Sequence, residues 1–217
     1  MSYHDVVRRA AAAAARVGRE PSSVTLVAVS KAKSVPEIEA VYAMGHRDFG
    51  ENRAQEMAGK AARLPDDVRR HFVGALQSNK ARLVRPITHL LHSMDRESLA
   101  AAWAKGNGLP PPVLLQVNTG REPQKSGVMP EDVPATLERV LALGLEVRGL
   151  MAIPPLGDEP EAQRSHFALL SRLRRDVARD HPSMAELSMG MTDDFEVAIE
   201  EGSSIIRVGR AIFGERT

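Results

Sequence analysis

Apolar runs rich in β-branched residues alternate with helix-like segments along the whole chain. The first run, Val24 to Ser30, is apolar almost throughout instead of alternating with polar residues. That pattern is typical of a parallel strand that is buried on both faces. Further strand-like runs lie at residues 47–49, 71–73, 90–93, 113–118, 147–151, 186–189 and 205–208.

Helical patterns separate these runs. One opens the chain, and the others cover residues 35–44, 52–63, from 78 onward, 96–105, 130–143, 161–179 and 193–201. About eight strand-then-helix units predict an α/β fold, a (β/α)8 TIM-like barrel with an extra N-terminal helix. An open doubly wound sheet is the alternative, but the Gly-x-Gly-x-x-Gly turn expected after its first strand is missing here.

Composition narrows the class of protein. The chain has 217 residues and no stretch that resembles a linker, so residues 1–217 are expected to form a single barrel domain. Hydrophobic residues make up 43% of the chain, which is enough apolar material for a core. The 29 Lys and Arg residues almost balance the 28 Asp and Glu residues, so nucleic acid is not an expected partner.

The absence of cysteine excludes disulfides, thiolate metal sites and cysteine nucleophiles. No apolar stretch is long enough to span a bilayer, so no membrane partner is expected. The N-terminal segment carries Arg8 and Arg9 before a run of alanines, but Asp5 and the lack of a bulky apolar core argue against a secretory signal. We expect a helix here and a cytoplasmic protein.

Lys31 stands where the first buried strand ends, and barrels of this kind place their active sites at the carboxyl ends of the strands. Burying an ammonium group is costly, so burial lowers a lysine's pKa and favours the neutral amine that attacks an aldehyde. The alternative is a lysine that simply extends its ammonium group into solvent.

Two glycine-containing turns after the seventh and eighth strands are candidate phosphate-binding loops. Gly190 to Asp193 opens one predicted helix, and Gly209 opens another. Glycine lets backbone N–H groups approach an anion, and Thr192 could add a hydroxyl donor. Alternatively, Thr192 and Asp193 cap a helix and Gly209 makes a tight turn.

A strand-end lysine and two phosphate loops together suggest a phosphorylated aldehyde, and pyridoxal 5'-phosphate (PLP) fits that description. Arg207 is the candidate residue to face the ring nitrogen. An arginine there would disfavour a protonated pyridinium, because two positive charges would face each other. The alternative for Arg207 is a salt bridge to a neighbouring carboxylate.

Several motifs, taken in order and spacing, resemble those of the pyridoxal phosphate homeostasis proteins, which are related to the barrel domain of bacterial alanine racemase. They cover nearly the whole chain. The motifs are Ala28-Val29-Ser30-Lys31-Ala32-Lys33, Phe49-Gly50-Glu51-Asn52, His71 to Lys80, Lys125-Ser126-Gly127, Gly149 to Pro154, Leu187 to Asp194 and Gly202 to Gly214. Arg70, where an aromatic residue is usual, Ala75, where proline is common, and Thr192, where serine is frequent, depart from the pattern.

The resemblance implies a monomeric barrel with PLP on Lys31, and with Lys33 as the second candidate for the Schiff base. It implies phosphate contacts from Ser188, Thr192 and Gly209, a ring-nitrogen contact from Arg207, and a pocket lined by Asn52. Lys125 matches a lysine that could take part in cofactor transfer. An ordinary loop cation is the alternative reading of Lys125.

The sequence favours a carrier over an enzyme. A racemase needs a base on each face of the substrate carbon, and the tyrosines of this chain, Tyr3 and Tyr42, are predicted on helices away from the strand ends. We therefore expect a protein of vitamin B6 homeostasis that buffers PLP and passes it transiently to PLP-requiring apoenzymes. No catalytic residue and no metal site are expected.

Two alternatives remain open. The first is a PLP-dependent racemase or another PLP enzyme of unknown substrate, with His71 or Lys125 as the second base, although His71 is expected at the opposite end of the barrel. The second is a barrel that binds another phosphorylated metabolite, with Lys31 as a simple cation.

Overall fold

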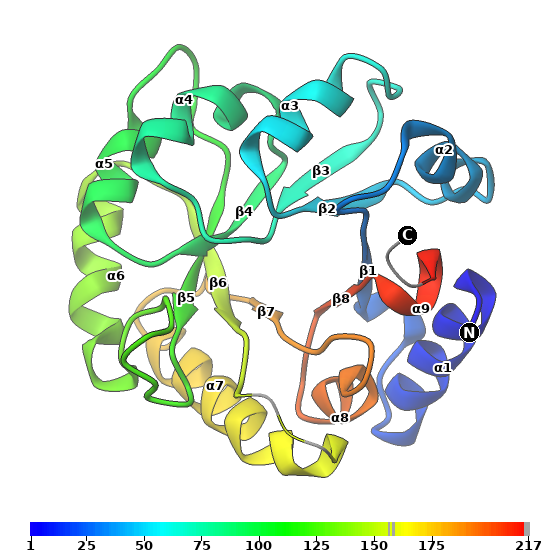
Figure 1. Cartoon of the computed structure of the whole chain (residues 1–217). Helices are drawn as coiled ribbons and strands as arrows, with labels where there is room; N and C mark the ends of the chain where they lie inside the picture. The colour runs from blue at the N-terminus through cyan, green and yellow to red at the C-terminus, as the bar shows by residue number, and fades with distance from the viewer. Residues whose placement is uncertain (156, 158, 215–217) are drawn as a thin grey trace.

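Eight parallel strands close into a barrel in this computed structural model, which describes residues 1–155, 157 and 159–214. Spatial order follows chain order, and the first strand pairs with the last (Figure 1). The predicted (β/α)8 barrel with its additional N-terminal helix is confirmed. The strands are β1 (Thr25–Val29), β2 (Asp48–Glu51), β3 (Arg69–Phe72), β4 (Leu90–Met94), β5 (Val113–Val117), β6 (Val147–Ala152), β7 (Glu186–Ser188) and β8 (Ile205–Val208).

Helices surround the barrel on the outside (Figure 1). They are α1 (Tyr3–Arg16), α2 (Val35–Ala43), α3 (Ala54–Ala61), α4 (Ala81–Val84), α5 (Glu97–Ala104), α6 (Val133–Ala142), α7 (Arg164–Val177), α8 (Phe195–Glu200) and α9 (Arg210–Phe213). Short 3-10 turns precede α4, α6 and α7, where the sequence pattern predicted continuous helix. Pro130 and Pro160 stand at the first positions of two of these turns, because proline is tolerated only where its missing N–H is not needed.

Two strand boundaries differ from the sequence prediction in ways that matter for the site. β2 begins at Asp48 and continues through Glu51, so Gly50 and Glu51 lie inside the strand instead of after it. β3 begins at Arg69, which makes His71 its third residue. Glu51 is a buried polar residue, whereas Arg69 is half-exposed, and neither gives the apolar signal of a buried strand.

Apolar side chains fill part of the barrel interior. Val27, Val73, Leu90, Leu114 and Met151 form one cluster there, together with Ile205. A larger cluster lies between the strands and the helices α3 to α8. Together the two clusters bury both faces of β5, whose five residues are all buried as the run of apolar residues predicted.

Helix α1 packs against the last elements of the chain. It begins with a capping box, in which the Ser2 hydroxyl and the Asp5 carboxylate each satisfy a backbone N–H. The buried face of α1 carries Val6, Ala10, Ala13 and Ala14 and contacts a cluster from α8, β8 and α9. Figure 1 shows α1 beside α9.

The two ends of the barrel differ. The carboxyl ends of the strands lead into the turns that carry Lys31, Asn52, Thr192 and Gly209. The amino ends surround a cavity of about 290 Å³, which is lined by Ser23, Thr25, Asp48, Arg69, His71, His89, Leu90, Arg148, Glu186, Ser204 and Ile205. None of the described helices is long and apolar enough to cross a membrane.

Candidate cofactor site

Lys31 occupies a tight turn directly after β1. The backbone N–H of Ser30 donates to the Gly50 carbonyl at 2.8 Å, which continues the pairing of β1 with β2 one residue beyond the strand. Ala32 then adopts a φ of 59°, an uncommon conformation for a residue with a Cβ. The Ala32 N–H donates to the Glu56 carboxylate at 2.5 Å. The Lys31 side chain is half-buried, and its turn is fixed from both sides.

A buried ion-pair cluster lies beside the Lys31 turn. Glu51 accepts hydrogen bonds from the Ser30 hydroxyl at 2.8 Å and from Lys60 Nζ at 2.7 Å. Lys60 also donates to the Ser30 carbonyl at 2.8 Å and to Glu56 at 2.6 Å. Burial raises the pKa of Glu51, and the Lys60 ammonium group opposes that shift. Sequence reasoning gave Glu51, Glu56 and Lys60 no role; the signal available was Glu56 and Lys60 at i,i+4 on one predicted helix face.

Lys33, the second candidate for the Schiff base, is engaged elsewhere. Its ammonium group donates to the Phe213 carbonyl at 2.9 Å and lies 3.3 Å from a Glu37 oxygen. The side chain is buried, and it ties the turn after β1 to α9 at the end of the chain. Its contacts give Lys33 a structural role in this arrangement.

Asn52 follows β2 and packs against Gly74, which follows β3. A Cβ on Gly74 would lie 2.6 Å from the Asn52 carbonyl oxygen and 2.7 Å from its Cβ, so only glycine permits this approach. The Asn52 side-chain oxygen is buried and has no hydrogen-bond partner among the described residues. A buried acceptor of this kind is a place where a bound molecule can donate a hydrogen bond.

The turn between β7 and α8 depends on a second glycine. Gly190 has a φ of 91°, and a Cβ there would lie 2.5 Å from the Ala198 side chain. Asp194 is the N-cap residue of α8, and its carboxylate accepts a hydrogen bond from the Met191 N–H at 2.6 Å. Thr192 is therefore not the cap of this helix; it lies half-buried within the turn.

The turn after β8 lies close to β1. A Cβ on Gly209 would sit 3.0 Å from the Val29 carbonyl oxygen. Arg210 pairs with Asp193 at 2.6 Å, so the turns after β7 and β8 are linked. The two predicted phosphate loops are thus neighbours at the carboxyl end of the barrel.

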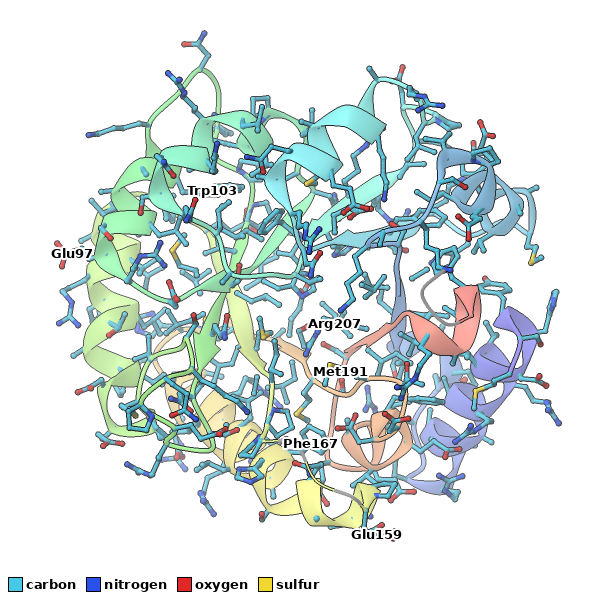
Figure 2. All side chains as sticks on the ribbon, in the orientation of Figure 1. Glu97, Trp103, Glu159, Phe167, Met191 and Arg207 are labelled. Atoms are coloured by element: carbon cyan, nitrogen blue, oxygen red, sulfur yellow. The ribbon has the colours of Figure 1, made fainter. Side chains whose placement is uncertain are left out.

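Arg207 lies inside the barrel as the third residue of β8, near its centre in Figure 2. Its guanidinium group donates to the Ser188 hydroxyl at 2.6 Å and to the Ala152 carbonyl at 2.9 Å. Both acceptors are neutral, and no ion pair with Arg207 occurs in the described part of the chain. Burial lowers the pKa of Arg207 to about 10, which leaves it charged at neutral pH, and the charge of Asp194 opposes the shift. Three of its five N–H donors remain for other acceptors.

Ser188 is the last residue of β7, and its side chain is fully buried in the barrel. Besides Arg207, its hydroxyl contacts His92 Nδ1 at 2.8 Å. His92 Nε2 lies 2.9 Å from His71 Nδ1, and His71 Nε2 lies 3.0 Å from an Asp48 oxygen. The structure therefore joins Ser188 to Arg207 and to a chain of polar side chains; the phosphate contact expected for Ser188 stays a prediction.

The other residues considered from the sequence lie apart from Arg207. Lys125 pairs with Glu122 at 2.5 Å and also reaches the Pro154 carbonyl. Tyr3 and Tyr42 lie on α1 and α2, as predicted, and contact His46 and Asp67. Within the described residues, no group of three His, Asp or Glu side chains could hold a metal ion.

These features fit a phosphorylated aldehyde with an aromatic ring. Arg207 offers charged donors, Asn52 offers an unpartnered acceptor, and Lys31 offers an amine at the same end of the barrel. Gly190 and Gly209 carry no side chain at the start of the two neighbouring turns, so the backbone is accessible there.

Comparison with known proteins agrees with the geometry. The family model of the alanine racemase N-terminal domain matches residues 5–217. The pyridoxal phosphate homeostasis protein of Pseudomonas aeruginosa is 45% identical over 216 residues, which cover 97% of this chain and 93% of the relative. The protein of the same name from Deinococcus radiodurans is 43% identical over 218 residues, which cover 98% of this chain and all of the relative.

A solved structure of PipY from Synechococcus elongatus with PLP bound is similar as well. Its TM-score is 0.81 at 37% identity, and the match covers 96% of this chain and 100% of PipY. Fold and site define a barrel of the alanine racemase N-terminal domain class. Within that class, the chain belongs to the pyridoxal phosphate homeostasis protein family. The resemblance inferred from the motifs is confirmed.

Proposed function

We propose that this protein binds PLP as a Schiff base on Lys31 and buffers and delivers the cofactor within the cell. The observation that carries the proposal is Arg207, a buried guanidinium group with neutral partners and spare donors below the turns that hold Lys31 and the glycines. Leaving such a charge buried without a strong acceptor is costly, and the ring nitrogen of PLP is an acceptor. The relatives named for PLP homeostasis and the PLP-bound PipY structure support the same assignment.

Each site residue has a distinct role in this proposal. Lys31 supplies the amine, and its fixed turn keeps that amine at the mouth of the barrel. Thr192 and the N–H groups next to Gly190 and Gly209 bind the phosphate, Asn52 accepts a hydrogen bond from the cofactor, and Arg207 donates to the ring nitrogen. PLP, when bound, supplies an electrophilic aldehyde and an electron-withdrawing ring. An arginine at the ring nitrogen keeps that nitrogen unprotonated, which weakens the electron sink.

Carrier function is favoured over catalysis because the candidate second bases among the described residues lie elsewhere, and Lys125 is paired with Glu122. Tyr3 and Tyr42 lie on outer helices, and His71 lies at the amino end of the barrel. Transient transfer to PLP-requiring apoenzymes, a monomeric state and a cytoplasmic location are parts of the same proposal. If the purified, PLP-loaded protein exchanged the α-proton of amino acids with deuterated water at an enzyme-like rate, the proposal of a carrier would be wrong.

Borohydride trapping followed by mass spectrometry tests the attachment site. We expect the PLP-loaded protein to show an absorbance band in the visible range and a pyridoxyl adduct on Lys31. Lys31→Ala should lose both, whereas Lys33→Ala, the matched control, should keep the adduct because Lys33 is committed to Phe213 and Glu37. An adduct found on Lys33 instead of Lys31 in the wild-type protein, or no uptake of PLP at all, would contradict the proposal.

A further inference from the structure

A chain of hydrogen-bonded side chains crosses the barrel from Arg207 to the cavity at the opposite end. It passes from Arg207 to Ser188, then across the barrel to His92, His71 and Asp48, with heavy-atom distances of 2.6, 2.8, 2.9 and 3.0 Å. Five strands contribute one residue each. All five side chains are buried, and His92 and Ser188 are fully so. The function proposed above uses only Arg207, at one end of this hydrogen-bond chain.

Neutral histidines leave one self-consistent direction for these hydrogen bonds. Arg207 can only donate, so the Ser188 oxygen accepts from it. Ionised Asp48 can only accept, so His71 must carry its proton on Nε2 and leave Nδ1 as an acceptor. His92 then carries its proton on Nε2, and the Ser188 hydroxyl donates to His92 Nδ1. Every donor in the chain points away from Arg207.

The neutral state of His92 and the charge of Asp48 are supported by their surroundings. Burial holds the pKa of His92 well below its usual range, and the nearby His71 and Arg207 act in the same direction. Burial opposes the ionisation of Asp48, but hydrogen bonds from Arg69 and His71 outweigh it and hold the pKa of Asp48 below its usual range. The chain therefore runs from a fixed cation to a fixed anion.

One added proton reverses the direction of the hydrogen bonds between His71, His92 and Ser188. If His71 carries protons on both nitrogens, its Nδ1–H points at His92 Nε2, which must then accept. His92 gives up its Nε2 proton and gains one on Nδ1, which points at the Ser188 oxygen, and the Ser188 hydroxyl keeps its proton but no longer donates to His92. One proton is taken up from solvent, none is lost, and no covalent bond between heavy atoms changes. The Ser188 oxygen then accepts from Arg207 and His92 at once.

Solvent reaches His71 through the amino-end cavity, since His71 and the half-exposed Arg69 both line that cavity. Its ring also lies 5.4 Å from that of His89. The titratable and charged groups that face His71 or share its cavity are Asp48 from β2, Arg69 from β3, His89 just before β4, His92 in β4, Arg148 from β6 and Glu186 from β7. Arginine and carboxylate charges are balanced two against two, so the proton state of the histidines decides the net charge of the cavity.

We propose that Ser188, His92 and His71 are positioning residues for Arg207, and that a proton taken up at His71 from the cavity reverses the chain and loosens the hold on PLP. The reversed hydrogen bonds make His92 compete with Arg207 for the Ser188 oxygen, so the guanidinium group of Arg207 is held less firmly in its position. This proposal rests on the proposed function, in which PLP is the ligand. The hydrogen-bonded side chains themselves are present in the protein without PLP.

Nitrogen-15 NMR of the histidine rings in PLP-free protein tests the chain directly, over about pH 5.5 to 8.5, the range in which histidines ordinarily titrate. We expect His92 to carry its proton on Nε2 at pH 8, and to shift that proton to Nδ1 in the same pH transition in which His71 becomes doubly protonated. A His92 that carries its proton on Nδ1 at pH 8, or a tautomer that stays fixed while His71 titrates, would overturn the proposal.

PLP binding measured by absorbance titration at pH 6 and pH 8 tests the consequence. His71→Gln keeps a donor toward Asp48 but cannot take up a proton; His89→Gln is the matched control, since His89 lines the same cavity outside the chain. Wild type and His89→Gln should lose about tenfold more affinity on acidification than His71→Gln, the size of one hydrogen bond to a charged group.

If the PLP affinity of the three proteins depended equally on pH, the proposed link between His71 protonation and PLP binding would be overturned. Absence of PLP binding in all of them would overturn the proposed function and the coupling with it, whereas the histidine spectra would still decide the direction of the chain. Those spectra need only wild-type protein, so the test stands even if His71→Gln fails to fold.

Discussion

Two buried charges inside this barrel are stabilised in different ways. Asp48 is held by charged and polar donors, with Arg69 and His71 directly on its oxygens. Arg207 is held by neutral acceptors and keeps donors in reserve. A residue whose charge is fully satisfied contributes to stability, and a residue with unused donors is available for a ligand.

Asp48→Asn should destabilise the protein by about 1–3 kcal/mol at pH 7, because it removes a charged acceptor from Arg69 and His71. The pKa of Asp48 is lowered in the folded state, so its contribution is complete above the unfolded value of about 4 and is lost as the pH falls further. Urea unfolding at pH 7 and at pH 3.5 should therefore show a smaller difference between variant and wild type at the lower pH. A difference that grows with acidity would contradict this account.

At the scale of elements, glycine sets how closely neighbouring strands approach. β6 pairs with β5 through Val113 with Val147 and then Leu114 with Gly149, so Arg148 is an extra residue in β6, a bulge. That extra residue is among those that line the amino-end cavity. Opposite Gly149 on the other side lies Glu186 of β7. A glycine beside a bulge is typical of a close backbone approach.

Gly149→Ala should cost at least about 3 kcal/mol or prevent folding, because a Cβ there would lie 1.9 Å from the Glu186 carbonyl oxygen, a backbone atom that cannot move aside cheaply. Gly59→Ala is the matched control. It lies within α3 with open space around it and should stabilise the protein by about 0.5–1 kcal/mol. Urea unfolding of both variants measures the contrast, and equal effects would refute the close approach of β6 and β7.

For the whole molecule, α1 joins the beginning of the chain to its end. Its buried alanines pack on Phe195 and Ile199 of α8, while Trp103 lies buried in α5 on the opposite side of the barrel (Figures 1 and 2). If residues 1–217 form one domain, as the sequence predicts, a destabilising substitution in α1 must also lower the unfolding midpoint that Trp103 reports. The closed order of strands from β1 to β8 supports that expectation.

Ala13→Asp should destabilise the protein by at least about 3 kcal/mol, because it places a carboxylate at a fully buried position. Trp103 fluorescence and far-ultraviolet circular dichroism should report the same lowered urea midpoint if the barrel unfolds as one unit. Ala12→Asp, on the exposed face of the same helix, should change stability by less than about 1 kcal/mol. A Trp103 midpoint that stays unchanged in Ala13→Asp would argue for two independently unfolding parts.

Local pattern was sufficient for the order of the elements and for the residues at strand ends. The apolar run before Lys31 identifies β1, because the consecutive residues Val27 and Ala28 point to opposite faces and both are fully buried. The bounds predicted for β8 agree with the structure at both ends. The position of Lys31 and the glycines of the two turns also follow from the sequence, since strand-to-helix order alone sends them to one end of a barrel.

Only the closed barrel decided which buried polar groups meet. His92 and Ser188 lie 96 residues apart, and their contact depends on β4 and β7 facing each other across the interior. His71 and Asp48 fall in strands that the sequence predicted, but their contact, and that of His71 with His92, joins three different strands and follows from no pattern along the chain. A pattern along the chain reports which residues avoid water, whereas partners for buried charges are chosen by the distances that strand pairing and barrel closure impose.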